Sequence, residues 1–324
     1  MKAIIYTKSG ALDGLKIQDV PTPTPNDDQA LIRVKACALN VLEFTHFANM
    51  DKKPSLFSKL TDKMTGALGH PLGGEVAGIV ERVGGNVTGL KKGDAVFGVT
   101  PGATPSGGLA EYAVLDKNNV ALKPANLSFA QAASATLMFE TALGALRKAK
   151  VKSGDQVLIY GASGGVGQYA AQIAKAMGAE VTGVCSTRNV ELAKEMGCTQ
   201  VIDYKTQDFR KINTRFDVII AVNGSADVKD LLGMLKSDGT LIPIGQHYTK
   251  ALLRAPFNKH IATYSQPMAP QKDYLKVATK LADTGKLAPH VDHVWPASEA
   301  KQAFEYALTQ HPQGKIVIAT DFSE

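Results

Sequence analysis

Residues 160–167 read Tyr-Gly-Ala-Ser-Gly-Gly-Val-Gly, between an apolar run at 156–160 and an Ala-rich run at 165–177. Glycines let a chain turn tightly and approach a pyrophosphate, and the first turn of a following helix presents free N–H groups to that anion. The order of strand, glycine-rich turn and helix therefore predicts a dinucleotide-binding unit. The spacing is a variant of G-x-G-x-x-G in which Ala162 takes the first-turn position.

The same rhythm of strand and helix continues along the chain. Further strand-like apolar runs lie at 180–185, 200–203, 216–222 and 239–245, with helix-like runs between them. Such alternation predicts a parallel sheet with helices on both faces. A stretch rich in Ala, Leu and Met at 129–149 predicts helical structure just before this region.

The first 125 residues have a different texture. Short strand-like runs, such as 30–36, stand between glycines, and Pro21, Pro23 and Pro25 impose an extended entry to that strand. Many short strands between glycines predict an irregular barrel. After about residue 267, the sequence predicts two helices and a last strand at 315–319.

The composition describes a folded chain with a basic balance. A length of 324 residues suggests two domains, and 44% hydrophobic with 20% charged residues exclude a mainly disordered chain. The net charge of +6 attracts anions. Neither an RNA-binding motif nor a basic tail is present, so we expect no nucleic-acid partner.

The cysteines and apolar runs bear on the compartment. Cys37, Cys185 and Cys198 are far apart and form no CxxC pair, which predicts reduced thiols. The apolar run near Met1 is too short for a signal peptide, and no run approaches the length of a membrane span. We therefore expect a cytoplasmic protein without a membrane span.

The glycine-rich turn also matches a second motif. Gly161, Ser163 and Gly165 fit G-x-S-x-G, the nucleophile elbow of serine hydrolases, which likewise joins a strand to a helix. Five histidines that follow could complete a triad with Ser163: His247, His260, His290, His293 and His311. Gly167 and the strand that follows the helix favour a dinucleotide-binding turn over a nucleophile elbow.

The residues at the end of the next strand indicate which dinucleotide the unit binds. NAD sites place an acidic residue about 20 residues after the glycines to bind the ribose 2′-hydroxyl. Here Ser186, Thr187 and Arg188 follow the strand, and a guanidinium pairs well with a phosphate. This favours NADPH, although Arg188 is also consistent with a plain surface arginine.

Taken together, these segments resemble the medium-chain dehydrogenase/reductase superfamily, in its zinc-independent quinone oxidoreductase branch. The likeness also extends to chloroplast-envelope quinone oxidoreductase homologues and alkenal/enone reductases, and covers nearly the whole chain. The segments that carry it, in order, are 35–40, 73–78, 93–98, 108–112, 141–143, 161–167, 203–204 and 314–317.

The resemblance implies an α/β fold of two domains. A GroES-like β-barrel catalytic domain would comprise 1–124 and 267–324, and a Rossmann domain with a doubly wound parallel sheet would comprise 125–266 and bind NADP(H). It also implies a homodimer, and we expect edge strands to pair near residues 239–244.

Zinc-dependent relatives differ at two positions that bind the metal. They have a Cys where this chain has Asn40, and Gly-His-Glu where it has Gly73-Gly74-Glu75; the four cysteines of their structural zinc lobe are also absent. We therefore expect no metal. Without a Lewis acid, alcohol oxidation is disfavoured and a conjugated acceptor is more suitable.

The resemblance also assigns site residues. Asn40 would lie at the mouth of the substrate cleft and donate its amide to a carbonyl or quinone oxygen, although an Asn that binds local backbone is an equal alternative. Substrate contacts are expected in 41–68, where the chain departs from its relatives. The cofactor-binding set comprises Thr141, Gly161, Ala162, Ser163, Gly164, Gly165, Val166, Gly167, Ser186, Thr187, Arg188, Tyr204, Asn223, Gly245 and Lys315.

These residues lead to one principal function and two alternatives. The principal one is an NADPH-dependent oxidoreductase that transfers hydride to quinones or α,β-unsaturated carbonyls without zinc. The alternatives are a non-enzymatic, crystallin-like NADPH-binding protein and the serine hydrolase with Ser163 as nucleophile.

Overall fold

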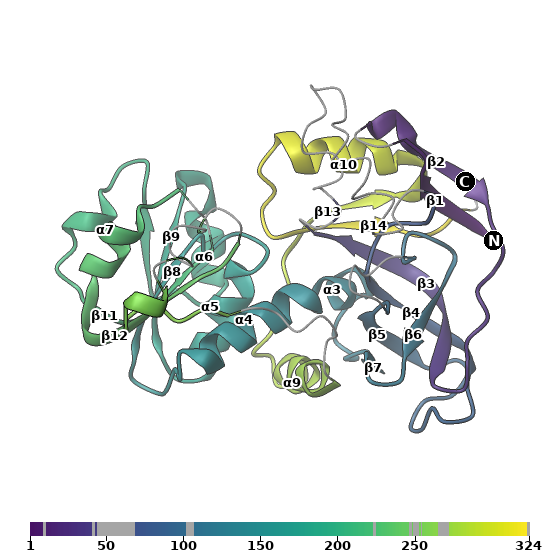
Figure 1. Ribbon diagram of the computed structural model, residues 1–324, viewed down its shortest axis with the longest axis horizontal. Coiled ribbons are helices and arrows are strands. Elements are labelled where there is room, and N and C mark those ends of the chain that lie inside the picture. The colour runs from purple at the N-terminus through teal and green to yellow at the C-terminus, as the bar shows by residue number, and fades with distance from the viewer. Residues whose placement is uncertain are drawn as a thin grey trace. The chain divides into compact units, whose positions relative to one another are not determined.

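The computed structural model describes residues 1–8, 11–40, 43, 69–101, 107–222, 225–245, 248, 253, 255–264 and 272–322. The chain divides into two compact units. The first consists of Met1–Leu137, Pro267–Asp283 and Pro289–Glu324, and the second of Met138–Gln266 and Thr284–Ala288. The first unit therefore joins the N-terminal strands, purple in Figure 1, to the yellow C-terminal elements. Its first segment extends to Leu137, beyond the boundary predicted at 124/125.

The first unit is mainly β-structure. Its strands are β1 (Lys2–Tyr6), β2 (Leu15–Asp19), β3 (Gln29–Leu39), β4 (Glu75–Val83), β5 (Ala95–Val99), β6 (Tyr112–Asp116), β7 (Val120–Leu122), β13 (Val291–Pro296) and β14 (Lys315–Ala319). Its helices are α3 (Phe129–Ser134), α9 (Lys272–Asp283) and α10 (Ala300–Thr309). β1 and β2 form an antiparallel pair, and the others form one sheet in the order β13-β14-β3-β4-β5-β7, with β6 paired to β3.

The long strand β3 organises this sheet. It is antiparallel to β4 along most of its length, to β6 over Gln29–Arg33 and to β14 over Ala36–Leu39. Its inward side chains, among them Ile32, Cys37 and Leu39, are buried in the core of the unit. The end of β3 and the starts of β4 and β14 thus meet at one edge, which positions the residues of the site described below.

The second unit contains the predicted parallel sheet. Its strands are β8 (Gln156–Tyr160), β9 (Glu180–Cys185), β10 (Gln200–Asp203), β11 (Phe216–Ala221) and β12 (Leu235–Pro243), in the order β10-β9-β8-β11-β12. They alternate with α5 (Gly167–Ala176), α6 (Val190–Glu195) and α7 (Val228–Gly233), after α4 (Leu137–Lys148) (Figure 1). All pairings are parallel, and the sheet is buried, which confirms the predicted α/β class.

The stretch 129–149, which was predicted to be helical, forms two helices with a break between them. α3 ends before Ala135, whose backbone leaves the helical region at φ −92° and ψ 40°. The break coincides with a tertiary interaction. Glu75 on β4 accepts hydrogen bonds from the Thr136 hydroxyl at 2.8 Å and from the Leu137 N–H at 2.9 Å. The carboxylate therefore satisfies a free N–H at the start of α4, which a continuous helix would not offer.

No helix in the described ranges is long and apolar enough to cross a membrane.

Candidate functional site

The glycine-rich turn leads from β8 into α5. Gly161 has φ +91°, a left-handed conformation that favours glycine, and its N–H donates to the Val184 carbonyl at 3.0 Å. A Cβ at Gly167 would lie 2.0 Å from the Gly161 carbonyl oxygen, so only glycine fits where the helix starts against the turn. Gly164 is less confined, since its Cβ would have only one neighbour, at 3.5 Å. The turn thus leaves room for a ligand at the helix N-terminus.

The residues predicted to select the nucleotide lie together at the end of β9. Cys185 pairs with Asp203 on β10, and the Cys185 carbonyl accepts the Tyr204 N–H at 3.1 Å. This register places Tyr204, which is 42% exposed, beside the segment of Ser186 and the exposed Arg188. The structure therefore brings the predicted 2′-phosphate residues to one edge of the sheet.

Sequence reasoning missed a carboxylate at this edge. Asp203 ends β10, and a hydrogen bond from the Thr187 side chain is the main cause that lowers its pKa, assisted by the Lys205 N–H at 2.9 Å. The Lys205 ammonium also lies 5.5 Å from the centre of the Tyr204 ring. The acidic residue stands on the neighbouring strand, so a search confined to the end of β9 could not find it.

The remaining predicted cofactor residues belong to different elements of the two units. Thr141 is buried on α4, and Gly245 follows β12 with φ +101°. Asn223 lies outside the described residues. Lys315 is in the first unit, where its ammonium binds the Glu75 carboxylate at 2.5 Å. This ion pair assigns Lys315 a structural partner that the sequence did not indicate.

Asn40 lies in the same buried cluster as that ion pair. Its amide nitrogen donates to Glu75 Oε2 at 3.2 Å, the oxygen that also binds Lys315. The other oxygen, Oε1, accepts from Thr136 and Leu137. Glu75 is fully buried, and its four donors match the acceptor capacity of a carboxylate. The cluster thus joins the end of β3, the start of β4, the start of α4 and the start of β14.

A second buried carboxyl group lies beside Asn40. Glu43 Oε2 accepts the Asn40 backbone N–H at 2.9 Å, and the Glu43 side chain is buried. Burial is the main cause that raises the pKa of Glu43 to about 7, and the negative charge of Glu75 adds to it. Glu43 belongs to the 41–68 stretch where substrate contacts were predicted; the rest of that stretch lies outside the described residues.

The raised pKa of Glu43 predicts a pH-dependent loss of stability. The folded chain holds this proton up to about pH 7, whereas the unfolded chain releases it near 4.5. Stability therefore falls as the pH rises through that interval, and the loss is complete above about 7. One pKa unit corresponds to about 1.4 kcal/mol. The difference in the free energy of unfolding between Glu43→Gln and wild type should therefore shift in favour of the variant by about 2–3 kcal/mol between pH 4.5 and pH 8. Urea unfolding at the two pH values tests this, and an equal difference at both would contradict it.

The described residues do not fit a zinc ion. Gly74 offers no ligand side chain, the Asn40 amide is bound to Glu75, and the Lys315 ammonium occupies the other side of that carboxylate. A fixed ammonium at this point repels a divalent cation. Within the described ranges no three His, Cys, Asp or Glu side chains are grouped as metal ligands would be.

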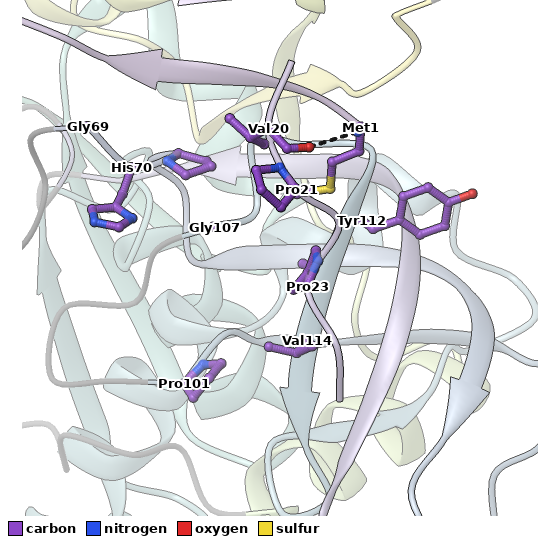
Figure 2. A pocket seen from close by; sticks show the side chains of 12 residues that line it. Met1, Val20, Pro21, Pro23, Gly69, His70, Pro101, Gly107, Tyr112 and Val114 are labelled. Carbon is purple, nitrogen blue, oxygen red and sulfur yellow. Dashed lines mark hydrogen bonds between the residues drawn. The ribbon is translucent and has the colours of Figure 1, made fainter. Parts of the chain in front are cut away.

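Another hollow of the first unit contains none of the predicted site residues. This depression of about 360 Å3 is lined by Met1, by residues of the segments 20–23, 69–71 and 107–114, and by Pro101 (Figure 2). Its walls are mostly apolar, and Figure 2 shows proline rings along them. The Met1 ammonium lies at this wall and donates to the Val20 carbonyl at 2.9 Å, but none of the predicted site residues lines the depression, so we do not assign the reaction to it.

The hydrolase alternative gains no support at Ser163. This residue lies in the turn before α5, and no histidine of the described part hydrogen-bonds to its hydroxyl. His260 instead has its Nδ1 2.9 Å from the Gly239 carbonyl oxygen, and His247 is outside the described residues. A nucleophilic serine needs a base within reach, and the structure does not supply one there.

The fold and the site define a class of protein: a GroES-like domain joined to a dinucleotide-binding parallel sheet. A family model of the alcohol dehydrogenase GroES-like domain matches residues 26–125, and one of a zinc-binding dehydrogenase matches residues 196–318. The chain belongs to the medium-chain dehydrogenase/reductase superfamily of oxidoreductases, in its quinone oxidoreductase-like branch.

Individual relatives agree with this assignment. The chain is 34% identical to 2-methylene-furan-3-one reductase of Solanum lycopersicum, over 98% of its own length and 79% of the relative. It is 31% identical to a chloroplastic NADPH-dependent alkenal/one oxidoreductase of Arabidopsis thaliana, with the same coverage. The solved quinone oxidoreductase from Coxiella burnetii has a TM-score of 0.84 and 31% identity, with 98% of this chain and 99% of that chain covered. The predicted family and fold are thus confirmed.

Proposed function

We propose that this chain is an NADPH-dependent oxidoreductase that transfers hydride to quinones or α,β-unsaturated carbonyls without zinc. The carrying observation is the buried Asn40 amide beside the Lys315–Glu75 ion pair, where zinc-dependent relatives have metal ligands. The names of the relatives, an enone reductase, an alkenal/one oxidoreductase and a quinone oxidoreductase, support the same substrate class.

The residues of the second unit would hold the cofactor. The backbone of 161–167 and the N-terminus of α5 suit a pyrophosphate, and Arg188 with Tyr204 suits a 2′-phosphate. When bound, NADPH supplies the hydride. The protein then has to orient the acceptor, exclude water and stabilise the charge that develops on the acceptor oxygen.

Asn40 is the residue proposed for that last role. The Asn40 NH2 group has two N–H donors: one donates to Glu75 at 3.2 Å, and the other would be directed at the carbonyl or quinone oxygen. There it would stabilise the enolate or hydroquinone anion, in which conjugation already spreads the charge. The product carbon or oxygen takes its proton from water. This chemistry requires no Lewis acid, which accords with a site that does not fit zinc.

Steady-state assays test the proposal directly. We expect oxidation of NADPH in the presence of 1,4-benzoquinone or a 2-alkenal, with kcat reduced about 100-fold in Asn40→Asp, which replaces the donor by an acceptor. NADPH affinity should not change in that variant. Tight NADPH binding without oxidation on any acceptor would contradict the enzyme and favour a non-enzymatic NADPH-binding protein.

Arg188→Ala tests the choice of nucleotide. Loss of a charge-assisted contact should weaken NADPH binding roughly 10- to 100-fold and change NADH binding little. Fluorescence titration with both nucleotides measures this. Arg210→Ala is the matched control, because Arg210 is an exposed arginine of the same unit that binds Asp208 at 2.8 Å. Equal losses for NADPH and NADH in Arg188→Ala would refute the phosphate assignment.

We also propose a cytoplasmic homodimer, in which the contact between the two copies differs from the one predicted near residues 239–244. The Leu241 N–H donates to the His260 carbonyl at 2.7 Å, and the Leu241 carbonyl accepts the Ala262 N–H at 3.0 Å. This side of β12 is therefore already paired at the residues where contact with a second copy was predicted. A second copy would instead meet the segment around Ile261, and sedimentation velocity measures whether the dimer forms.

A further inference from the structure

The polar cluster of the first unit holds Asn40 at two points. Glu43 accepts its backbone N–H at 2.9 Å, and Glu75 accepts its side-chain amide at 3.2 Å. Asn40, Glu43 and Glu75 are all buried, with exposed fractions of 4%, 4% and 0%. Both carboxyl groups therefore act where water cannot replace them, and a lost hydrogen bond has its full cost.

The Lys315–Glu75 pair determines how the Asn40 amide is turned. An ionised carboxylate only accepts hydrogen bonds, so the NH2 end of the amide must face Glu75 and the Oδ1 end must face away. Thr136 and Leu137 fix the second oxygen of the same carboxylate. Rotation of Glu75 would break several hydrogen bonds together, which makes it a rigid reference for the amide.

The charges around Asn40 do not balance when both carboxyl groups are ionised. Among the residues that the structure describes, the charged and titratable groups that act on Glu43 are Glu75 on β4, Lys315 on β14 and the Cys37 thiol on β3. The packed helix α3 contributes no ionisable side chain. Burial raises the pKa of the Cys37 thiol well above its ordinary value, so it remains neutral. Within the described part of the chain, one ammonium thus lies with two carboxyl groups, and burial raises the pKa of Glu43 to about 7.

We infer that Glu43 and Glu75 are positioning residues for Asn40, Glu43 through the main chain and Glu75 through the side-chain amide, with Lys315 as the counter-ion that orients Glu75. This inference rests on the proposed function, because the positioned amide is the one proposed to stabilise the acceptor oxygen. Its consequence is a pH dependence. Ionised Glu43 places a second negative charge beside an anionic transition state, so turnover falls as Glu43 loses its proton.

The kinetic test compares three variants with a matched control. In wild type, we expect kcat for a 2-alkenal with saturating NADPH to fall about fivefold as the pH rises through 7. Glu43→Gln keeps an acceptor for the Asn40 N–H and should lose this inflection, whereas Glu43→Ala and Glu75→Gln should lose about tenfold in kcat at every pH. Affinity for NADPH should not change in any of them. Glu81→Gln is the control, because Glu81 lies on the same strand as Glu75 but binds the exposed Lys92.

A second readout does not depend on turnover. With 15N-labelled asparagine, the backbone amide signal of Asn40 should shift with pH in wild type with a midpoint near 7, and should not titrate in Glu43→Gln. An Asn40 signal that does not titrate, or Glu43 variants that match Glu81→Gln in kcat and pH profile, would overturn the inference. A titrating Asn40 amide in a protein without turnover on any acceptor would support the positioning and refute the proposed function.

Discussion

Lys315→Met is expected to lower the free energy of unfolding of the first unit by about 3–5 kcal/mol, because it leaves the Glu75 carboxylate buried without a counter-ion. The Glu75 side chain has no exposed surface, and that of Lys315 is 3% exposed. Removal of one partner from such a pair costs far more than the pair contributes in net terms, since the remaining charge is desolvated. The effect should therefore exceed that of most single substitutions.

The chain contains a close control for this experiment. Lys92 binds Glu81 at 2.5 Å, the same distance as Lys315 to Glu75, and both glutamates lie on β4. The Lys92 side chain is 72% exposed, so solvent screens this second pair and Lys92→Met should leave the unfolding midpoint close to that of wild type. The two substitutions thus differ mainly in burial.

The measurement can follow the first unit alone. The chain has one tryptophan, Trp295, which belongs to this unit and contacts Tyr306. Urea unfolding monitored by tryptophan fluorescence therefore reports on the unit that contains the ion pair. Equal midpoints for Lys315→Met and Lys92→Met would show that Glu75 does not need its counter-ion. The double variant Glu75→Gln, Lys315→Met should recover part of the loss, because it removes the unpaired charge.

The same ion pair explains what the sequence could not indicate. The parallel sheet and its glycine-rich turn were predictable, because period, strand length and turn chemistry are local to 156–167. Glu75 and Lys315 are 240 positions apart, and only the antiparallel register of β3, β4 and β14 brings them together. No spacing in the chain carries that information. The resemblance grouped Lys315 with the cofactor residues, and its ion pair with Glu75 was not predicted.

Two other differences between the sequence-based prediction and the structure also arise from contacts between distant segments. The helix predicted at 129–149 breaks at Thr136, because a carboxylate from a distant strand offers acceptors for Thr136 and Leu137. Asp203 joins the proposed nucleotide edge through strand pairing with Cys185. Propensity and motif spacing describe what a segment prefers, and tertiary hydrogen bonds decide where it ends and what faces it. The second unit thus contains a turn that is predictable from local sequence, whereas the polar cluster of the first unit is revealed only by the folded chain.

Gly167→Ala is expected to weaken NADPH binding by more than 100-fold and to destabilise the second unit by about 3 kcal/mol. The new Cβ would lie 2.0 Å from the Gly161 carbonyl oxygen and 2.9 Å from backbone atoms of Ala162. Backbone atoms cannot swing aside as a flexible side chain does, so either the turn or the first turn of α5 must move. The glycine-rich turn and the first turn of α5 together form the proposed pyrophosphate-binding site. A displaced helix N-terminus no longer directs its N–H groups at the anion.

Two further glycine variants separate folding from binding in this experiment. Gly233→Ala meets no atom within 4 Å and should change neither stability nor NADPH affinity. Gly164→Ala places its Cβ 3.5 Å from the Gly161 carbonyl oxygen, an ordinary contact, so the fold should tolerate it. If the pyrophosphate approaches the backbone of this turn, Gly164→Ala should still weaken NADPH binding at least tenfold. Wild-type affinity in Gly164→Ala, together with a loss in Gly167→Ala, would show that the turn only shapes the helix entry and that the cofactor lies elsewhere.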